Sequence, residues 1–101
     1  MRVLLTGSEP FGKEEVNPSE LAVRAFQQVV AGRLSDVEVR VTVLSVSFRR
    51  AGPLLERLIE ELKPDAYLGV GLCSGVSHVA VERVAVNLKD ARIPDNDGGQ
   101  P

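Results

Sequence analysis

LLTGSEPFG, residues Leu4–Gly12, begins as a short apolar run and passes through a glycine into a loop. The run Val3–Leu5 is continuous rather than alternating, which is typical of a strand buried on both faces of a sheet. The loop holds Phe11 between Pro10 and Gly12, two residues that favour turns. A connecting turn needs no aromatic side chain, so Phe11 is a candidate for the wall of a pocket.

After this loop, the sequence signals the start and end of a helix. Asn17 suits the N-cap, and Pro18 suits the first helical position. Glu20 stands where a capping box places its carboxylate. Apolar residues then recur at helical spacing, which predicts a helix that ends near Gly32.

Further elements follow in alternation. Valines at every second position from 37 to 43 predict a half-buried strand. Gly52-Pro53 opens a second predicted helix, which Pro64 stops. Residues 66–72 predict a buried strand, and about 79–88 a fourth strand. This order predicts one domain over residues 1–101, an α/β sandwich with a mixed sheet and flanking helices.

Composition limits the possible functions. The chain has 101 residues, 44% of them apolar, and a net charge of −2, which gives no electrostatic footprint for nucleic acid or an anionic membrane. Apolar runs are too short for a membrane span. Cys73 is the single cysteine, so no internal disulfide forms, and a reducing, cytoplasmic compartment is expected.

Glu82 is the most unusual residue of the predicted fourth strand. It shares a face by period two with the apolar Ala80 and Val84, so it is expected to be buried. A buried carboxylate is costly unless it meets a cation or imidazole, or its pKa rises. A glutamate near solvent at a strand end, or in a structural ion pair, is the alternative.

Geometry argues against a local triad of Cys73, His78 and Glu82. If His78 already belongs to the extended strand, it lies four residues from Glu82, about 13 Å away and beyond hydrogen-bond reach. Cys73 is expected to be a small buried residue at a strand end, and His78 a loop or surface residue. The glycines of GVGLCSG, residues 69–75, match neither the dinucleotide fingerprint nor the P-loop, and close packing explains them better.

The loop DARIPDN, residues 90–96, carries Arg92 just past the fourth predicted strand. An arginine there could serve an oxyanion or a substrate carbonyl. A pairing of Arg92 with Asp90 or Asp95 is the structural alternative.

Three stretches together identify a family. LLTGSEPFG with NPS, PDAYLGVGL, and VERVAVNLKDARIPDNDGGQP closely resemble pyroglutamyl peptidase I, also called pyrrolidone carboxyl peptidase. The resemblance spans the whole chain. It implies a cofactor-free cysteine peptidase, without a metal, that removes amino-terminal pyroglutamate from peptides through a thioester, using Cys, His and Glu. It also implies an open-twisted α/β sandwich, often a cytoplasmic homotetramer.

The resemblance also assigns roles to residues. Glu82 falls on the family's catalytic glutamate, which orients the histidine, and Arg92 falls near the oxyanion region. Phe11 matches an aromatic that lines the pyrrolidone pocket, and Ile93 matches an apolar pocket residue. Asn17 matches an asparagine close to the substrate, although its helix cap alone could explain it.

Departures from the family pattern limit these expectations. The family's nucleophilic cysteine and catalytic histidine lie beyond Pro101, so the chain is expected to be the amino-terminal part of a longer peptidase domain and inactive alone. Ser8 replaces an aromatic of the pocket, and Leu72 replaces a glutamine near the pyrrolidone. A degenerate homologue that only binds partners is therefore the main alternative, and a nucleoside-phosphorylase-like sandwich a weaker one.

Overall fold

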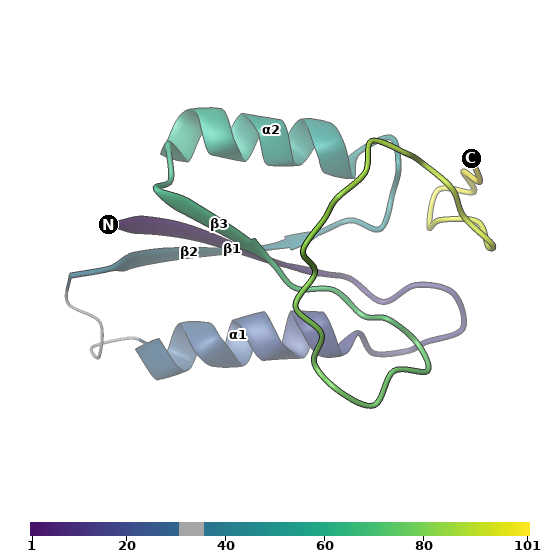
Figure 1. The fold of residues 1–101 in the computed structure, drawn as a ribbon, viewed down its shortest axis with the longest axis horizontal. Helices are drawn as coiled ribbons and strands as arrows, with labels where there is room; N and C mark the ends of the chain where they lie inside the picture. The colour runs from purple at the N-terminus through teal and green to yellow at the C-terminus, as the bar shows by residue number, and fades with distance from the viewer. Residues whose placement is uncertain (31–35) are drawn as a thin grey trace.

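A computed structural model describes residues 1–30 and 36–101 as an α/β unit (Figure 1). The expected end of the first helix near Gly32 lies outside the described residues. Along the chain the elements are β1 (Arg2–Ser8), α1 (Pro18–Val30), β2 (Glu38–Leu44), α2 (Ala51–Leu62) and β3 (Ala66–Gly69). These five elements confirm the first three predicted strands and both predicted helices.

The sheet has β1 at its centre, in the order β2-β1-β3. Both pairings are parallel, and Leu5 lies opposite Val41 on one side and Leu68 on the other. The helices cover opposite faces, α1 one face and α2 the other, so the unit has three layers (Figure 1). The α/β class is confirmed, but every pairing among the described strands is parallel, whereas a mixed sheet was expected.

The core is small and centres on β1. Leu4 and Leu5 are buried, as is Val23 of α1. A β-carbon on Gly7 would lie 2.6 Å from the carbonyl oxygen of Ser19 and 2.9 Å from Cγ2 of Val23. The glycine that ends the apolar run of β1 therefore lets α1 approach the strand closely.

The start of α1 follows the predicted cap. Oδ1 of Asn17 accepts the backbone N–H of Ser19 at 2.9 Å and its hydroxyl at 2.8 Å, and Asn17 is buried. Glu20 does not close a capping box, because its carboxylate accepts Nε of Arg24 at 3.2 Å instead. The prediction of the helix start is confirmed, and the detail of the glutamate is wrong.

The end of α2 is also the predicted one. Lys63 takes a left-handed conformation with φ of 46°, and its N–H donates to the carbonyl of Ile59 at 2.9 Å. Pro64 follows and cannot continue the helix. This turn leads directly into β3.

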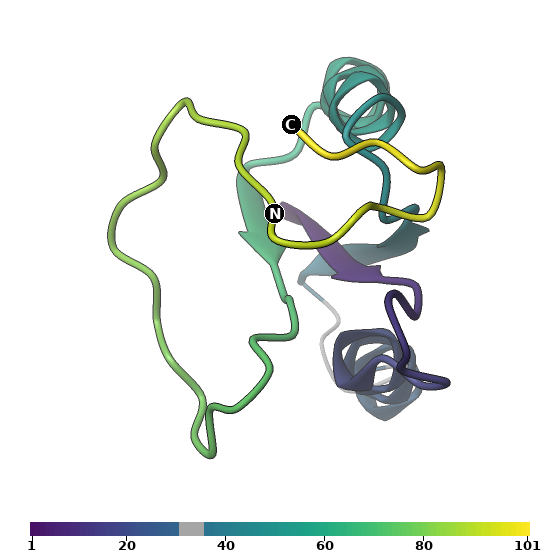
Figure 2. The same ribbon diagram turned by 90° about the vertical axis from the view of Figure 1, so that its right-hand side faces the viewer.

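The predictions for the last third of the chain are partly wrong. β3 ends at Gly69 and is exposed, because within the described residues it pairs only with β1. Residues 79–88 form no strand but part of a wide loop that stands away from the sheet (Figure 2). A strand needs a neighbour for its backbone hydrogen bonds, and none lies beside this segment among the described residues. Val79 is 95% exposed as a result.

The described helices include none that is both long and apolar enough to cross a membrane. Similarly, no group of three or more His, Cys, Asp and Glu side chains suited to a metal ion occurs in the part of the chain that the structure describes.

Candidate functional site

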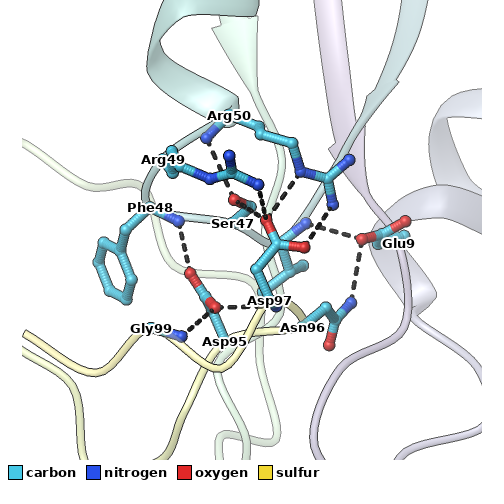
Figure 3. Close-up of polar contacts among 10 residues, drawn as sticks. Glu9, Ser47, Phe48, Arg49, Arg50, Asp95, Asn96, Asp97 and Gly99 are labelled. Atoms are coloured by element: carbon cyan, nitrogen blue, oxygen red, sulfur yellow. Dashed lines mark hydrogen bonds and ion pairs between the residues drawn. The ribbon is translucent and has the colours of Figure 1, made fainter.

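The candidate site lies at the carboxyl edge of the sheet. Because all the described strands are parallel, the loops that follow them start from the same edge. The loop after β1 covers residues 9–17, and the loop after β2 covers residues 45–50. The turn at residues 95–99 returns to this edge and contacts both loops (Figure 3).

Glu9 joins the loops after β1 and β2. Its backbone N–H donates to the carbonyl of Leu44 at 3.0 Å. Its carboxylate oxygen Oε1 accepts the N–H of Val46 at 3.0 Å and Nδ2 of Asn96 at 3.0 Å (Figure 3). One half-buried carboxylate thus joins its own loop to two segments that are far apart in sequence.

Asn96 also forms hydrogen bonds to both loops, the one after β1 and the one after β2. Besides Glu9, its Nδ2 donates to the carbonyl of Pro10 at 2.9 Å. Its backbone N–H donates to the carbonyl of Val46 at 2.9 Å. The position of residue 96 relative to residues 9–10 is therefore fixed by side-chain and backbone hydrogen bonds together.

The contacts among Glu9, Asn96, Asp97 and Arg50 are called the junction below, because they join the loops at this edge. Asp97 and Arg50 form its charged part. Arg50 holds Asp97 with two hydrogen bonds, Nε to Oδ2 at 2.8 Å and Nη2 to Oδ1 at 3.0 Å (Figure 3). The hydroxyl of Ser47 donates to Oδ2 at 2.5 Å. The hydrogen bonds from Arg50 are the main cause that lowers the pKa of Asp97, and the hydrogen bond from Ser47 is the second. In turn, the hydrogen bond to Asp97 is the main cause that raises the pKa of Arg50.

Asp95 shapes the turn and fastens it in front of α2. Its Oδ2 accepts the backbone N–H of Phe48 at 2.7 Å. Its Oδ1 accepts the N–H groups of Asp97 at 2.9 Å and Gly99 at 2.8 Å. The hydrogen bond from Phe48 is the main cause that lowers the pKa of Asp95, which keeps the carboxylate ionised and able to accept all three bonds.

Two of the expected pocket residues come from segments that the structure brings together. Ile93 lies beside the turn that follows Phe11, because a β-carbon on Gly12 would be 3.2 Å from Cδ1 of Ile93. Phe11 is half-buried, and Ile93 is 49% exposed. An aromatic and an aliphatic residue thus stand on adjoining loops at the edge of the sheet, and their place in a pocket stays a prediction.

Asn17 has a clear structural role in the same loop. Its Nδ2 donates to the carbonyl of Glu9 at 3.0 Å, while its Oδ1 caps α1. Only 1% of Asn17 is exposed. The structural alternative for this residue is therefore supported, and its contact with a substrate stays a prediction.

The two expected catalytic residues lie apart from this junction. Glu82 is exposed on the wide loop, so the expectation of its burial is wrong, for the same reason that its strand does not form. Arg92 is exposed and forms no ion pair with Asp90 or Asp95, both of which the structure describes. Their roles stay predictions.

The residues of the rejected local triad are all exposed. Cys73 lies at the surface, contrary to the expectation of a small buried residue, because β3 ends before it. His78 is exposed, as expected. No hydrogen bond joins Cys73, His78 and Glu82 among the contacts of residues 1–30 and 36–101.

No sequence pattern predicted the junction of Glu9, Asn96, Asp97 and Arg50. Ion pairs across 47 residues leave no local pattern, because any arginine on a loop could meet any aspartate. The available signals were the Asp-Asn-Asp-Gly turn at 95–98 and the glutamate inside SEPFG. Neither motif indicates which distant residue it contacts in the folded protein.

Two hollows lie away from the expected site residues. One, of about 410 Å³, is polar and opens near Met1, Asp36 and Lys63, close to the amino ends of the strands. The other, of about 380 Å³, is apolar and lies between α1 and the sheet, beside Phe26 and Leu68.

These features define an α/β protein with an open parallel sheet and a loop site at the carboxyl ends of its strands. Comparison with known proteins makes this class specific. The sequence model of the pyroglutamyl peptidase family matches residues 1–101. The chain therefore belongs to the pyroglutamyl peptidase family.

Similar proteins agree with this assignment. The pyrrolidone-carboxylate peptidase of Pyrococcus furiosus is 46% identical over 98 residues, which are 97% of this chain and 46% of that protein. That of Pseudomonas fluorescens is 52% identical over 99 residues, 98% of this chain and 46% of that protein. A crystal structure of a mutant pyrrolidone carboxyl peptidase from P. furiosus covers all of this chain with a TM-score of 0.90 at 44% identity, over 47% of its own length. The chain thus spans about half the length of these relatives.

Proposed function

We propose that the complete protein is a cysteine exopeptidase that removes amino-terminal pyroglutamate from peptides. The observation that carries the proposal is the 46% to 52% identity, over nearly the whole chain, to proteins named pyrrolidone-carboxylate peptidases. The matched residues cover 97% and 98% of this chain, so the compared region includes the loops that hold Phe11, Arg92 and Ile93.

In the proposed reaction, a cysteine thiolate attacks the carbonyl carbon of the pyroglutamyl residue. The amine of the next residue leaves, and water hydrolyses the resulting thioester. The cysteine and the histidine come from residues outside these 101, and Glu82 orients the histidine. The 101-residue chain alone is then inactive, and Cys73 takes no part.

The proposed pocket uses the residues gathered at the carboxyl edge of the sheet. Phe11 and Ile93 form apolar walls for the flat lactam ring, and Asn17 supports the loop beside them or contacts the substrate itself. Arg92 has an exposed guanidinium that no described carboxylate pairs with, so its charge is available to a developing oxyanion. No cofactor or metal takes part.

The exposed apolar residues support a larger assembly. Val79, Val81 and Leu88 are each more than 70% exposed, and β3 has an unpaired outer edge within the described chain. Such a surface is costly in water. We propose that the rest of the complete protein covers it, in a cytoplasmic homo-oligomer.

The test is hydrolysis of peptides that begin with pyroglutamate, compared with the same peptides beginning with proline. The complete protein is expected to release pyroglutamate, and Glu82→Gln to lower kcat by about 10² to 10⁴. The second candidate, a homologue that binds without turnover, is favoured by Ser8 and Leu72 in the proposed pocket. Binding of a pyroglutamyl peptide without release of product would support that candidate.

A further inference from the structure

The structure assigns to Glu9 and Asn96 a further role, as positioning residues that hold the Phe11 loop and the Ile93 loop at a fixed separation. We infer that this pair sets the width of the pyroglutamyl pocket and hence the affinity for the substrate. The inference rests on the proposed function for its substrate, but the contact between the two loops stands on the geometry alone.

The pair occupies the point where the two loops meet. Glu9 precedes Phe11 by two residues, and Asn96 follows Ile93 by three. Their side chains bond directly, Nδ2 of Asn96 to Oε1 of Glu9 at 3.0 Å (Figure 3). The same Nδ2 reaches the carbonyl of Pro10 at 2.9 Å, which leaves a single residue between the junction and Gly12.

A common anchor makes the junction rigid. Val46, in the loop that follows β2, donates its N–H to Glu9 and accepts the N–H of Asn96 on its carbonyl, at 3.0 and 2.9 Å. Both loops are thus fixed to the same residue of the scaffold, as well as to each other. Beyond the junction they meet again where Ile93 lies beside Gly12.

The carboxylate of Glu9 and the amide of Asn96 each bond two partners at this point. Glu9 supplies one oxygen that accepts two N–H groups, and the amide of Asn96 donates to two acceptors through one nitrogen. The neighbouring pair of Asp97 and Arg50 fastens the turn to the loop after β2 and forms no hydrogen bond or ion pair with residues 9–12, although the charge of Glu9 contributes to the raised pKa of Arg50. The side chains of Glu9 and Asn96 therefore form the hydrogen bonds that join residues 9–10 directly to residue 96.

Steady-state kinetics of the complete protein on a pyroglutamyl peptide tests the positioning role. Glu9→Ala and Asn96→Ala are each expected to raise KM about tenfold, because one or two hydrogen bonds that fix the pocket walls are lost. kcat should change by less than about threefold, since the walls contact the ring and not the scissile bond. Glu9→Gln keeps the carbonyl acceptor, so it should restore a KM close to the wild-type value.

Two further variants separate positioning from general damage. The double variant Glu9→Ala/Asn96→Ala should raise KM by less than the product of the two single effects, because both single changes remove the shared Glu9–Asn96 hydrogen bond while each also removes one contact that the other keeps. Glu15→Ala removes an exposed carboxylate from the same loop and should leave both constants unchanged.

Hydrogen exchange gives a readout that does not depend on activity. Asn96→Ala should speed exchange in residues 9–12, and Glu9→Ala in residues 92–96, each across the junction from the change. Exchange confined to the mutated loop would overturn the inference, and so would an unchanged KM or an equal loss in the glutamine variant. A wild-type protein without pyroglutamyl hydrolysis would refute the proposed function and the substrate role with it, while exchange across the junction would still decide whether the loops are coupled.

Discussion

Replacing Gly7 by alanine tests whether close packing of α1 on β1 holds the unit together. The new β-carbon would lie 2.6 Å from the carbonyl oxygen of Ser19 and 2.9 Å from its carbonyl carbon. Both atoms belong to the backbone of α1, so the clash cannot be relieved by a side-chain rotation. Overpacking of this kind costs about 3 kcal/mol. Alanine also restricts the unfolded chain, which offsets about 0.5 to 1 kcal/mol. The expected net loss is about 2 kcal/mol.

Urea denaturation followed by circular dichroism measures this loss, and Gly52 provides the matched control. A β-carbon on Gly52 would meet nothing within 4 Å, and the residue lies in α2. Gly52→Ala is expected to stabilise the protein by about 0.5 to 1 kcal/mol through helix propensity. If Gly7→Ala proved as stable as Gly52→Ala, the argument that Gly7 exists for close packing would fail.

Three further changes have definite expected outcomes. Asn17→Ala should cost about 1 to 2 kcal/mol in urea denaturation through the lost cap of α1, and an unchanged midpoint would contradict that role. Tyr67→Phe removes the 2.8 Å hydrogen bond to Oγ1 of Thr6 and should cost about 1 kcal/mol, measured in the same way. Because Arg50 lowers the pKa of Asp97, the contribution of this pair to stability is present above the unfolded pKa of about 3.9 and is lost as pH falls through the lower folded value. Asp97→Asn should therefore flatten the dependence of stability on pH below about 4, whereas an unchanged acid limb would show that the pair contributes nothing.

The first two-thirds of the fold could be predicted because its signals are local. The cap at Asn17, the stop at Pro64 and the valines from 37 to 43 each act within a few residues of where they stand. The close contact of α1 with β1 at Gly7 depends on how the two elements pack in the folded protein. The sequence shows a glycine at this position but does not show which element packs against it.

The fourth strand shows the limit of periodicity. Residues 79–88 alternate well, but alternation states which face would be buried and not what would bury it. Without a neighbouring strand among the described residues, Glu82 and the valines beside it stay exposed. The same segment lies within the residues 1–101 that the family model matches.

The candidate site divides along similar lines. The resemblance singled out Phe11 and Ile93, and the structure places their loops side by side. The residues that join those loops, Glu9 and Asn96, are 87 positions apart and left no signal of their pairing. Residue propensities predict helices and strands, and motifs predict candidate catalytic or binding residues. Neither predicts which loops contact each other in the folded protein.

Mass-spectrometric detection of pyroglutamate released from a short pyroglutamyl peptide by the complete protein tests the central claim most directly. The account predicts stoichiometric release of pyroglutamate and of the shortened peptide, abolished by a thiol-alkylating reagent and strongly reduced in Glu82→Gln. An intact peptide after prolonged incubation with folded protein, or release that survives alkylation, would contradict it.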